Sequence, residues 1–497
     1  MIKNSHQSLQ NYILDLYNEI FISGNFPNTW RISTIIPIPK PDKDHSDPLN
    51  YRPISLTSCL CKLLERMINR RLVWFLEENQ HLNNTQSGFR KARSTTDCLA
   101  QLAGDVQQAI IEKNHTIGVF FDLEKAYDLT WKYSILKKLH EFGMRGNLPQ
   151  FIANFLKNRI IRVRIGTTHS RDMNVEEGVP QGSVLSCTLF AIAIDEVFKY
   201  LPRDVRAALY VDDLAIYVTG KRNTSILRKL QLAINKLEAW CDRTGFKFSE
   251  LKTAVMHVCR KRKCEKKAGP LFLNGKIIEE KESQKYLGLI IDKSLTWNKH
   301  IEYLRMDCRR RMNLLKHVGH LSWGADTKTL LLMYKAIIKS KIEYGAEIYG
   351  SASATLLAKL NALQNEALRI ATGAFKSSRI ESLEVLTGVM PLRLSRQQKL
   401  TKYMLRVWAT PTNPVNRFMS NNSSNRYINS EEPPHLTQFA QRSLAKKFES
   451  TSRELKLEQQ HLWIEGNTQF PPWKTESLAT MPRPHKKLER EHTRHYS

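Results

Sequence analysis

Two adjacent aspartates, Asp212 and Asp213, constrain this chain most, because they lie inside the apolar stretch ALYVDDLAIYV. Burying a carboxylate among Leu, Val, Ile and Tyr side chains costs several kcal/mol unless a cation or hydrogen-bond donors compensate. A hairpin turn that exposes both acids to water is the alternative interpretation, since Asp is a common turn residue. The favoured two-residue turn has the sequence Asp-Gly or Asn-Gly, however, whereas here Asp-Asp is followed by Leu214. The stretch therefore predicts two strands, within Ala207–Val218, interrupted by a functional carboxylate pair.

A third carboxylate follows another apolar run. Ile117–Phe121 predicts a buried strand, and Asp122 stands where this strand ends, so that its carboxylate projects from the strand's end. Glu124 and Asp128 are nearby acids, which equally fit solvated residues at the start of a helix. Magnesium prefers carboxylate and phosphate oxygens. Three carboxylates converging from two strands could hold two such ions ~4 Å apart and support phosphoryl transfer.

A loop rich in glycine and proline lies between these two acidic sites, in EEGVPQGSVLSCTLF. Gly178, Pro180 and Gly182 interrupt regular structure just before a predicted helix. The N-terminal amides of such a helix suit an anion or a closely approaching backbone. Taken alone, this pattern equally fits an ordinary turn between a strand and a helix.

The overall charge favours a polyanionic partner. The 497 residues contain 76 Lys and Arg against 48 Asp and Glu, which gives a formal net charge of +28. Nucleic acid is the first candidate, and a ribosome-associated or membrane-surface protein is the alternative. We expect no membrane partner, because no segment reaches the ~18 apolar residues of a membrane span and no signal peptide begins the chain. The eight scattered cysteines suit a reducing compartment, so we expect the nucleus and cytoplasm.

A possible zinc motif occurs in HVCRKRKCEKK, where His257, Cys259 and Cys264 lie close together. Zinc sites normally need a second close pair of ligands. The only CxC pair, Cys59 and Cys61, is far away in the sequence. On this basis the sequence does not predict a zinc site. The adjacent basic run RKRK at 260–263, with Lys266 and Lys267, equally fits a nuclear-localisation or RNA-contact patch and a solvated loop.

Helical and strand patterns alternate from about residue 10 to 292. Strands are predicted at Arg31–Lys40, which prolines close, and at Ile161–Ile165, which alternates with arginines. Helices are predicted by apolar spacing at Leu60–Glu78, Tyr133–Phe142, Pro149–Lys157, Leu189–Tyr200 and Ile226–Cys241.

The character of the chain then changes. Residues 293–372 are rich in helix formers, and a polar, turn-rich stretch that begins at about 410 is typical of a linker. The length suggests roughly three domains. We expect an α+β chain with an N-terminal helical segment, a mixed domain, a helical domain, a helical or linker segment and a disordered tail, at residues 1–19, 20–292, 293–395, 396–480 and 481–497.

Together these motifs resemble the reverse transcriptase of a non-long-terminal-repeat retrotransposon, most closely the jockey and I-type elements of animals. The matching stretches cover about residues 20–292 in the order of the family; they are WRISTIIPIPKPDKD, YRPISLTSCLCKLLERMINRRL, QSGFRKARSTTDCL, FFDLEKAYDLTW, GVPQGSVLSCTLFAIAID, YVDDLAIY, GFKFSELKTAVM and YLGLIID. Residues up to about 390, with NEALRIATGAF and VLTGVMPL, resemble the thumb of the family and the segment after it.

The resemblance implies a right-handed polymerase fold, with fingers, a palm built on an antiparallel sheet and a helical thumb, followed by a helical or irregular segment. It implies an RNA-directed DNA polymerase that adds dNTPs to the 3′-hydroxyl of a DNA primer on an RNA template during retrotransposition. The chain resembles the polymerase module of a longer open reading frame. The alternative is a catalytically inactive remnant that still binds nucleic acid.

The resemblance also implies roles for individual residues. The catalytic carboxylates would be Asp122, Asp212 and Asp213. These three residues and the carbonyl of Leu123 would bind two Mg²⁺ ions, with Mn²⁺ as the substitute. Lys252 would protonate the leaving pyrophosphate.

Further residues would contact the substrates. Tyr127 would lie beneath the sugar and reject a 2′-hydroxyl, and its other interpretation is core packing. The incoming nucleotide would also meet Lys40, Arg52, Gln181 and Gly182. Contacts with template or primer would come from Arg90, Arg93 and a primer-grip hairpin that contains Tyr286, Leu287 and Gly288.

Overall fold

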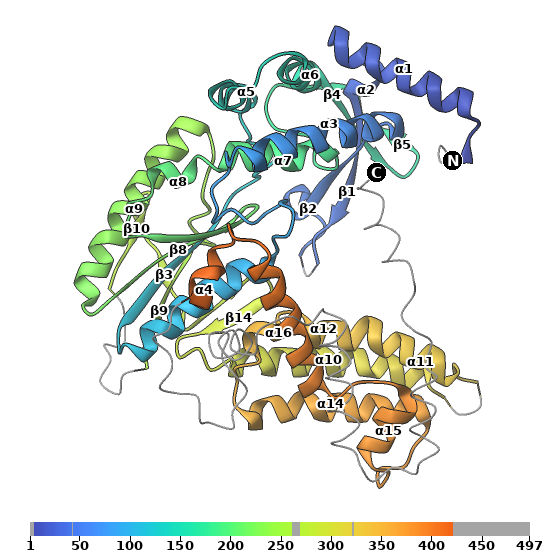
Figure 1. Cartoon of the computed structure of the whole chain (residues 1–497), viewed down its shortest axis with the longest axis vertical. Coiled ribbons are helices and arrows are strands. Elements are labelled where there is room, and N and C mark those ends of the chain that lie inside the picture. The colour runs from blue at the N-terminus through green and yellow to red at the C-terminus, as the bar shows by residue number, and fades with distance from the viewer. Residues whose placement is uncertain (1–3, 42, 261–268, 321–322, 421–497) are drawn as a thin grey trace. The chain divides into compact units, whose positions relative to one another are not determined.

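The structure is a computed structural model that describes residues 4–41, 43–260, 269–320 and 323–420 (Figure 1). The chain divides into two compact units. The first unit runs to Leu295 and also contains Thr410–Arg417, and the second unit begins at Thr296. The boundary predicted from the sequence, between residues 292 and 293, lies close to this division. Both helices and sheets are present, and the predicted α+β class is confirmed.

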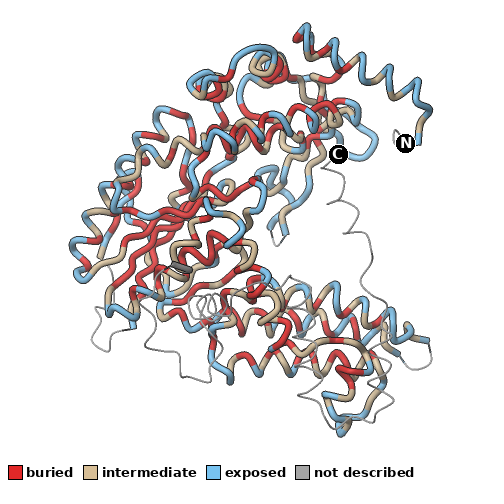
Figure 2. The backbone as a smooth tube through the Cα atoms, in the orientation of Figure 1, coloured by how far each residue is buried: buried red, intermediate tan, exposed pale blue. Residues whose placement is uncertain are grey.

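The central sheet of the first unit has five strands. Its order is β12 (Glu279–Glu280), β9 (Ala254–Val258), β3 (His115–Asp122), β8 (Asp213–Gly220) and β7 (Arg206–Tyr210). All neighbours are antiparallel except β12 and β9. Figure 2 shows buried backbone running through these strands, and only Asp122 of β3 is not buried. This agrees with the continuous apolar run of the strand, since such runs occur where both faces of a sheet are covered.

Different helices cover the two faces of the central sheet. Ile216 belongs to a large hydrophobic cluster that includes Ile226 and Leu230 of α9 (Asn223–Thr244). Its neighbour in the strand, Tyr217, points to the other face, where its hydroxyl donates to Asp105 of α4 (Thr95–Ile111) at 2.6 Å. Because successive side chains of a strand alternate between faces, α4 and α9 lie on opposite sides of the sheet.

A second sheet precedes the central one in the chain. It contains β2 (Tyr51–Leu56), β1 (Ile32–Pro39), β4 (Arg159–Ile165), β5 (Thr168–His169) and β6 (Met173–Val175). Only residues 32–35 of β1 pair with β4. Pro37 and Pro39 pair with β2 alone, so neither proline removes a hydrogen bond from a strand with two neighbours. The predicted strand with closing prolines is therefore observed.

Most of the predicted helices are present with small shifts of their ends. The first unit also contains α1 (Gln7–Ser23), α2 (Asn28–Arg31), α3 (Cys59–Glu78), α5 (Lys132–Glu141), α6 (Asn147–Leu156), α7 (Val184–Ile194) and α8 (Val197–Tyr200). Helix α4 was not predicted from the sequence. Its start does carry a signal, because Ser94 and Asp97 form a capping box in which the Ser94 amide donates to the Asp97 carboxylate at 2.6 Å.

The helix predicted at Leu189–Tyr200 differs in the structure. It begins at Val184, and it is interrupted between α7 and α8. The buried Lys138 ammonium donates to the carbonyl oxygens of Ile192 and Ala193 at 3.2 and 3.4 Å. These carbonyls would otherwise accept from amides one turn later, so Lys138 favours the interruption. Apolar spacing alone could not predict this long-range contact.

Short strands complete the first unit: β10 (Phe272–Leu273), β11 (Lys276–Ile277), β13 (Ser283–Tyr286) and β14 (Leu289–Asp292). The described part of the second unit contains helices and no strands, as expected for residues 293–372. These are α10 (Asn298–Val318), α11 (Thr327–Met333), the π-helix η3 (Tyr334–Lys339), α12 (Ser340–Glu343), α13 (Ala346–Tyr349), α14 (Ala354–Thr372), α15 (Ile380–Thr387), α16 (Leu392–Trp408) and α17 (Arg417–Ser420), whose first residue belongs to the first unit. No helix among the described residues is long and apolar enough to cross a membrane.

The chain returns to the first unit after α16. Thr410–Arg417, which includes η4 (Pro414–Asn416), packs against α4 at the start of the predicted linker. Here the Asn413 amide donates to the Asp97 carboxylate at 2.9 Å, and Arg417 forms an ion pair with Asp105. The predicted tail at 481–497 and the rest of the predicted linker lie outside the described residues.

The ion-pair network at Asp105 predicts a loss of stability when its charge is removed. The Asp105 side chain is 2% exposed, and it binds Arg206, Arg417 and the Tyr217 hydroxyl. Asp105→Asn leaves two guanidinium groups without their shared anion. We expect the free energy of unfolding to fall by about 3 kcal/mol, measured by urea unfolding with circular dichroism as the signal. Asp204→Asn is the control, because this carboxylate is exposed and forms its ion pair with the exposed Lys229, so the variant should hardly change the midpoint. Equal midpoints for the two variants would contradict a structural role for the network.

Candidate active site

The Asp212–Asp213 pair lies at a tight hairpin turn. Strands β7 and β8 are joined by Val211 and Asp212, and Tyr210 pairs with Asp213 at the base of the turn. Val211 has a φ of 61°, which is uncommon for a β-branched residue, and a positive φ at the first central position is typical of a type II′ turn. The turn interpretation and the functional interpretation are therefore compatible, because the turn itself presents the acids.

A backbone segment supports this turn from behind. The Ser87 amide donates to the Leu209 carbonyl at 2.9 Å, and the Leu209 amide donates to the Thr85 carbonyl at 3.3 Å. A Cβ atom on Gly88 would lie only 2.6 Å from the backbone nitrogen of Val211. Glycine is thus required for the backbone to approach the turn this closely, which fixes the unusual conformation of Val211.

Asp122 and Asp213 are direct cross-strand partners in β3 and β8. Side chains in this relation project to the same face of a sheet, with Cβ atoms about 4.5–5.5 Å apart. The backbone around Asp122 is also fixed, since its carbonyl accepts from the Ser249 amide at 2.8 Å and Leu123 forms an isolated bridge with Phe248. The fold therefore brings together the carboxylates that the sequence argument had grouped.

The electrostatics of the site reflect crowded negative charge. Partial burial raises the pKa of Asp213 to about 6, and the nearby carboxylates of Asp212 and Asp122 contribute to this rise. Burial and the charge of Asp122 also raise the pKa of Asp212. Both side chains retain access to solvent. Among the described residues, neither carboxylate belongs to an ion pair, so their charge is not compensated within the chain.

Lys252 forms an ion pair with one of the three aspartates. Its ammonium lies 2.9 Å from Oδ2 of Asp122, and the two side chains are 67% and 40% exposed. An ion pair this exposed contributes about 0–1 kcal/mol, so it can be exchanged for another partner at low cost. Within the described part of the chain, the three aspartates do not all have oxygens within 4.8 Å of one another.

The donor atoms at this site fit a divalent cation. Asp122, Asp212, Asp213 and the Leu123 carbonyl offer hard oxygen ligands, which Mg²⁺ prefers over nitrogen or sulfur. A bound cation would also offset the burial and the mutual repulsion that raise the pKa values of the two adjacent aspartates. The structure thus supplies both the ligands and an electrostatic reason for metal binding.

The glycine-rich loop makes two close backbone approaches. Gly178 has a φ of 80°, and an added Cβ would lie 2.7 Å from the Asp128 carbonyl oxygen. Gly182 has a φ of 127°, and its Cβ would lie 2.5 Å from the Ser55 carbonyl oxygen. The Ser55 amide in turn donates to the Gln181 carbonyl at 2.7 Å. The loop is therefore attached to β2 through its backbone, and the two glycines are required for this geometry.

Glu65 is a buried residue that the sequence argument did not identify. Its carboxylate accepts from the hydroxyl of Ser183 and from the amides of Val184 and Leu185, at 2.7 and 3.2 Å for the amides. The side chain is 0% exposed, and it satisfies free amides at the start of α7 while its charge interacts with the helix dipole. No local pattern in α3 marks Glu65, because its partners lie more than a hundred residues away.

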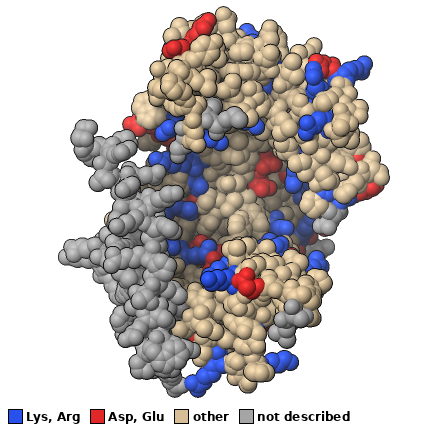
Figure 3. All heavy atoms as spheres, turned by 90° about the vertical axis from the view of Figure 1, so that its right-hand side faces the viewer, with Lys and Arg blue, Asp and Glu red and all other residues tan. Residues whose placement is uncertain are grey.

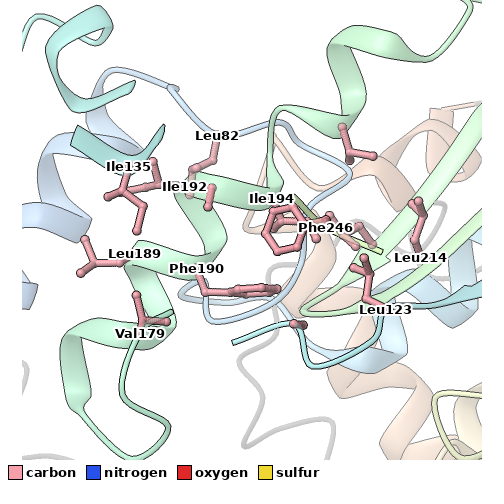
Figure 4. Packing of buried hydrophobic residues seen from close by; sticks show 14 of the residues in the cluster. Leu82, Leu123, Ile135, Val179, Leu189, Phe190, Ile192, Ile194, Leu214 and Phe246 are labelled. Carbon is pink, nitrogen blue, oxygen red and sulfur yellow. The ribbon is translucent and has the colours of Figure 1, made fainter. Parts of the chain in front are cut away.

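Tyr127 lies between the glycine-rich loop and α7. Its ring stacks on Phe190 with centroids 4.8 Å apart, and its hydroxyl lies 3.9 Å from the Cys187 sulfur. Figure 4 shows Phe190 beside Leu189 and Val179 in the hydrophobic cluster. Burial raises the pKa of Tyr127 above its usual value, so the hydroxyl stays protonated. The ring is thus held rigidly with part of its surface accessible.

The remaining predicted nucleotide contacts are Arg52 in the second sheet and Lys40 directly after its strand β1. The Lys40 ammonium donates to the Leu49 carbonyl at 2.9 Å, and Arg52 is exposed opposite Ile38 in the pairing of β1 and β2. Among the described residues, no hydrogen bond or ion pair joins either cation to the aspartates. Their roles in nucleotide binding remain predictions.

The predicted nucleic-acid contacts differ in how exposed they are. Arg90 is buried, and its guanidinium binds the Glu77 carboxylate at 2.7 Å, together with the carbonyls of Asn83 and Gln86. Arg93 donates to the Thr412 carbonyl at 2.6 Å. Both guanidinium groups already have partners within the first unit, so their contact with nucleic acid stays a prediction.

The predicted primer-grip hairpin is formed by β13 and β14. Leu287 and Gly288 make its turn, and both have positive φ angles. Tyr286 is buried and donates to the Ala208 carbonyl at 3.0 Å, behind the turn that carries the aspartates. Tyr286 therefore supports the hairpin of β7 and β8 from within the fold. The basic run after Arg260 lies outside the described residues.

Comparisons with known proteins give a consistent result. Residues 38–291 match the family described as reverse transcriptase (RNA-dependent DNA polymerase). The chain is 30% identical over 370 residues to the probable RNA-directed DNA polymerase from transposon BS of Drosophila melanogaster, covering 73% of this chain and 40% of that protein. It is 28% identical over 418 residues to the RNA-directed DNA polymerase from mobile element jockey of the same organism, covering 82% and 44%.

Solved structures that resemble the chain include the apo telomerase of Candida tropicalis. The sequences are 12% identical, the TM-score is 0.40, and the match covers 82% of this chain and 73% of that one. The chain spans 40% and 44% of the lengths of the two curated relatives from transposon BS and jockey.

The crowded carboxylates predict a pH-dependent effect of Asp213→Asn on stability. Since folding raises the pKa of Asp213 from 3.8 to about 6, ionisation destabilises the folded state as pH rises through this window. The whole pKa shift corresponds to about 3 kcal/mol of folding free energy. Because the Asp213 carboxylate is accessible to solvent, we expect a destabilisation of about 1 kcal/mol. In urea unfolding with a chelator, the free energy of unfolding of the variant should rise relative to that of the wild type between about pH 4 and pH 6. The difference should then stay constant above about pH 6.

Asp172→Asn is the matched control, because a hydrogen bond from Arg162 lowers the pKa of Asp172. This control should show no gain as the pH rises. A constant difference between Asp213→Asn and the wild type at all pH values would contradict the proposed repulsion.

Proposed function

Because the chain belongs to the reverse transcriptase (RNA-dependent DNA polymerase) family, we propose that it extends the 3′-hydroxyl of a DNA primer with dNTPs on an RNA template. The observation that carries this proposal is the pairing of Asp122 with Asp213, next to Asp212 in the turn. In the reaction, the primer oxygen attacks the α-phosphorus of the dNTP, and the bond to pyrophosphate breaks. Such chemistry depends on positioned charge rather than on a nucleophilic side chain.

Members of this family depend on divalent metal ions, and we propose two Mg²⁺ ions, with Mn²⁺ as a substitute. Asp122, Asp212, Asp213 and the Leu123 carbonyl would hold them, and the ions would lower the pKa of the primer hydroxyl and stabilise the leaving pyrophosphate. The exposed ion pair between Lys252 and Asp122 supports a role for Lys252 as proton donor. Once cations neutralise Asp122, the ammonium is free to protonate the pyrophosphate.

The residues around Tyr127 support a site for the incoming dNTP. Its stacked ring offers a rigid surface on which a deoxyribose fits, while an added 2′-hydroxyl would collide with it. Gln181 and Gly182 belong to the loop attached to β2, so they would form the adjoining wall. Lys40, which follows β1 directly, and Arg52 on β2 would contact the triphosphate, since cations suit its charge.

The net charge of +28 supports binding of an RNA template and a DNA primer. On the face shown in Figure 3, Lys and Arg side chains are visible over a wider area than Asp and Glu side chains. Arg90, Arg93 and the hairpin with Tyr286, Leu287 and Gly288 would support or contact these strands. By analogy with the jockey polymerase, the activity would serve retrotransposition, in the nucleus and cytoplasm.

Primer extension on an RNA template with Mg²⁺ tests this function. We expect the wild-type chain to incorporate dNTPs, and Asp212→Asn or Asp213→Asn to lower the rate at least ~10²-fold, because each removes a metal ligand. RNA affinity, measured by fluorescence anisotropy, should stay within about threefold of the wild type, because phosphate contacts dominate it.

Two outcomes would overturn the proposal. A wild-type chain that binds RNA tightly and incorporates no dNTP would be a catalytically inactive nucleic-acid-binding remnant. Variants that lose RNA binding together with extension would show that the aspartates are structural.

The position of Tyr127 predicts a loss of sugar discrimination in Tyr127→Ala. Removal of the ring opens space for a 2′-hydroxyl, so the preference for dNTPs over NTPs should fall by about 10- to 100-fold in single-nucleotide incorporation. Tyr127→Phe is the control, because it keeps the ring on Phe190 and loses only the contact with Cys187. Unchanged discrimination in Tyr127→Ala would assign the ring to core packing alone.

A further inference from the structure

A second group of candidate metal ligands lies at the opposite end of β3 from Asp122. His115 is the first residue of this strand, His257 lies near the end of β9, and Cys259 follows β9 directly. One ligand atom from each residue lies within 4.8 Å of the other two. Seven residue steps at about 3.3 Å each place His115 roughly 23 Å from Asp122, so this cluster is separate from the aspartates.

The strand register explains why the three side chains meet. Thr116 pairs with Val258 and Ile117 pairs with His257, so His115 lies next to Cys259 across the strands. His115 and Ile117 point to the same face of the sheet, and His257 shares that face with its partner Ile117. The sequence near His257 contains no second pair of ligands. The antiparallel register of β3 and β9 instead brings His115 to this position from a distant part of the chain.

The geometry of the cluster is close to that of a bound tetrahedral ion. Nδ1 of His115 and Nε2 of His257 are 3.1 Å apart, and the two rings stack with centroids 5.3 Å apart. Adjacent ligands on zinc are separated by roughly 3.3–3.8 Å, given Zn–N and Zn–S distances of about 2.0–2.1 and 2.3 Å. Small side-chain movements would therefore suffice to bring all three atoms to one ion.

The burial and type of the ligands also favour a particular metal. His115 and His257 are 8% and 7% exposed, while Cys259 is partly exposed, so an ion can reach the site from the side of the sulfur. Imidazole and thiolate ligands suit zinc, whereas Mg²⁺ prefers oxygen. We propose that His115, His257 and Cys259 bind a zinc ion that links β3 to β9, with water as the fourth ligand.

This site would stabilise the central sheet rather than take part in the reaction. The ion would connect the end of β3 to the chain leaving β9, at the end of the sheet remote from the catalytic turn. The other interpretation is a simple hydrogen bond between the two imidazoles, with one as donor and the other as acceptor. A zinc ion would bind the Cys259 sulfur, whereas the hydrogen bond involves only the two imidazoles, so a signal from the sulfur distinguishes the two interpretations.

Metal content and cobalt spectroscopy test the proposal on the untagged full-length chain. After dialysis against zinc at low concentration and then against metal-free buffer, we expect about one bound zinc per chain. Replacement with Co²⁺ should give the intense visible bands of tetrahedral coordination and a near-ultraviolet band from thiolate-to-cobalt charge transfer. The same measurements on Asp213→Asn should give the same result, which excludes the catalytic carboxylates as the source of the signal.

Variants of each ligand type have matched controls. Cys259→Ser and His257→Gln should weaken zinc binding at least about tenfold, and Cys259→Ser should remove the charge-transfer band. Cys59→Ser and His140→Gln change exposed residues outside the cluster and should keep both the zinc and the spectrum. Zinc should also raise the melting temperature of the wild type and of the two controls, but not that of the two ligand variants.

Two results would overturn the proposal. One is a wild-type chain that retains no more zinc than Cys259→Ser. The other is a cobalt spectrum without the thiolate band, which would leave the histidines as a hydrogen-bonded pair only. If a ligand variant fails to fold, the cobalt spectrum of the wild type still decides the question.

Discussion

The antiparallel pairing of β3 with β8 is the interaction on which the candidate site depends, because it places Asp122 directly across from Asp213. Two like charges directly across a strand pair repel each other, and burial together with the charges of Asp212 and Asp122 raises the pKa of Asp213. The chain tolerates this arrangement because β3 and β8 are buried in a sheet that α4 and α9 cover on both faces. The stable sheet thus holds together two carboxylates that would otherwise move apart. Both are accessible enough for a cation to neutralise their charge.

The surroundings of the aspartates are fixed mainly by backbone contacts and buried charges. Gly88 lets a neighbouring segment touch the turn, and Gly182 lets the glycine-rich loop touch β2. Glu65 on α3 binds the start of α7, which directly follows Gln181 and Gly182, two residues expected to contact a nucleotide. These contacts join elements that are far apart in the sequence, so small changes in one of them would be transmitted to the site.

Much of the fold was predictable because apolar periodicity is a local property. The buried strand before Asp122, the strand pair around the aspartates and the helix at Leu60–Glu78 all followed from spacing alone. The break between α7 and α8 was not predictable, because it depends on the contact of Lys138 with two carbonyls. The role of Glu65 and the meeting of His115 with Cys259 were also missed, since each depends on long-range pairing that a single sequence does not reveal.

The return of Thr410–Arg417 to α4 has a topological consequence. The chain leaves the first unit after Leu295, comes back to it at Thr410 and enters the second unit again at Phe418, so the two units are connected at three points of the chain. Cleavage at any one of these connections would leave the two units joined through the others. A chain ending before Thr410 would deprive Asp97 and Asp105 of their partners Asn413 and Arg417, so removal of residues 296–409 requires a rejoined backbone rather than a stop codon.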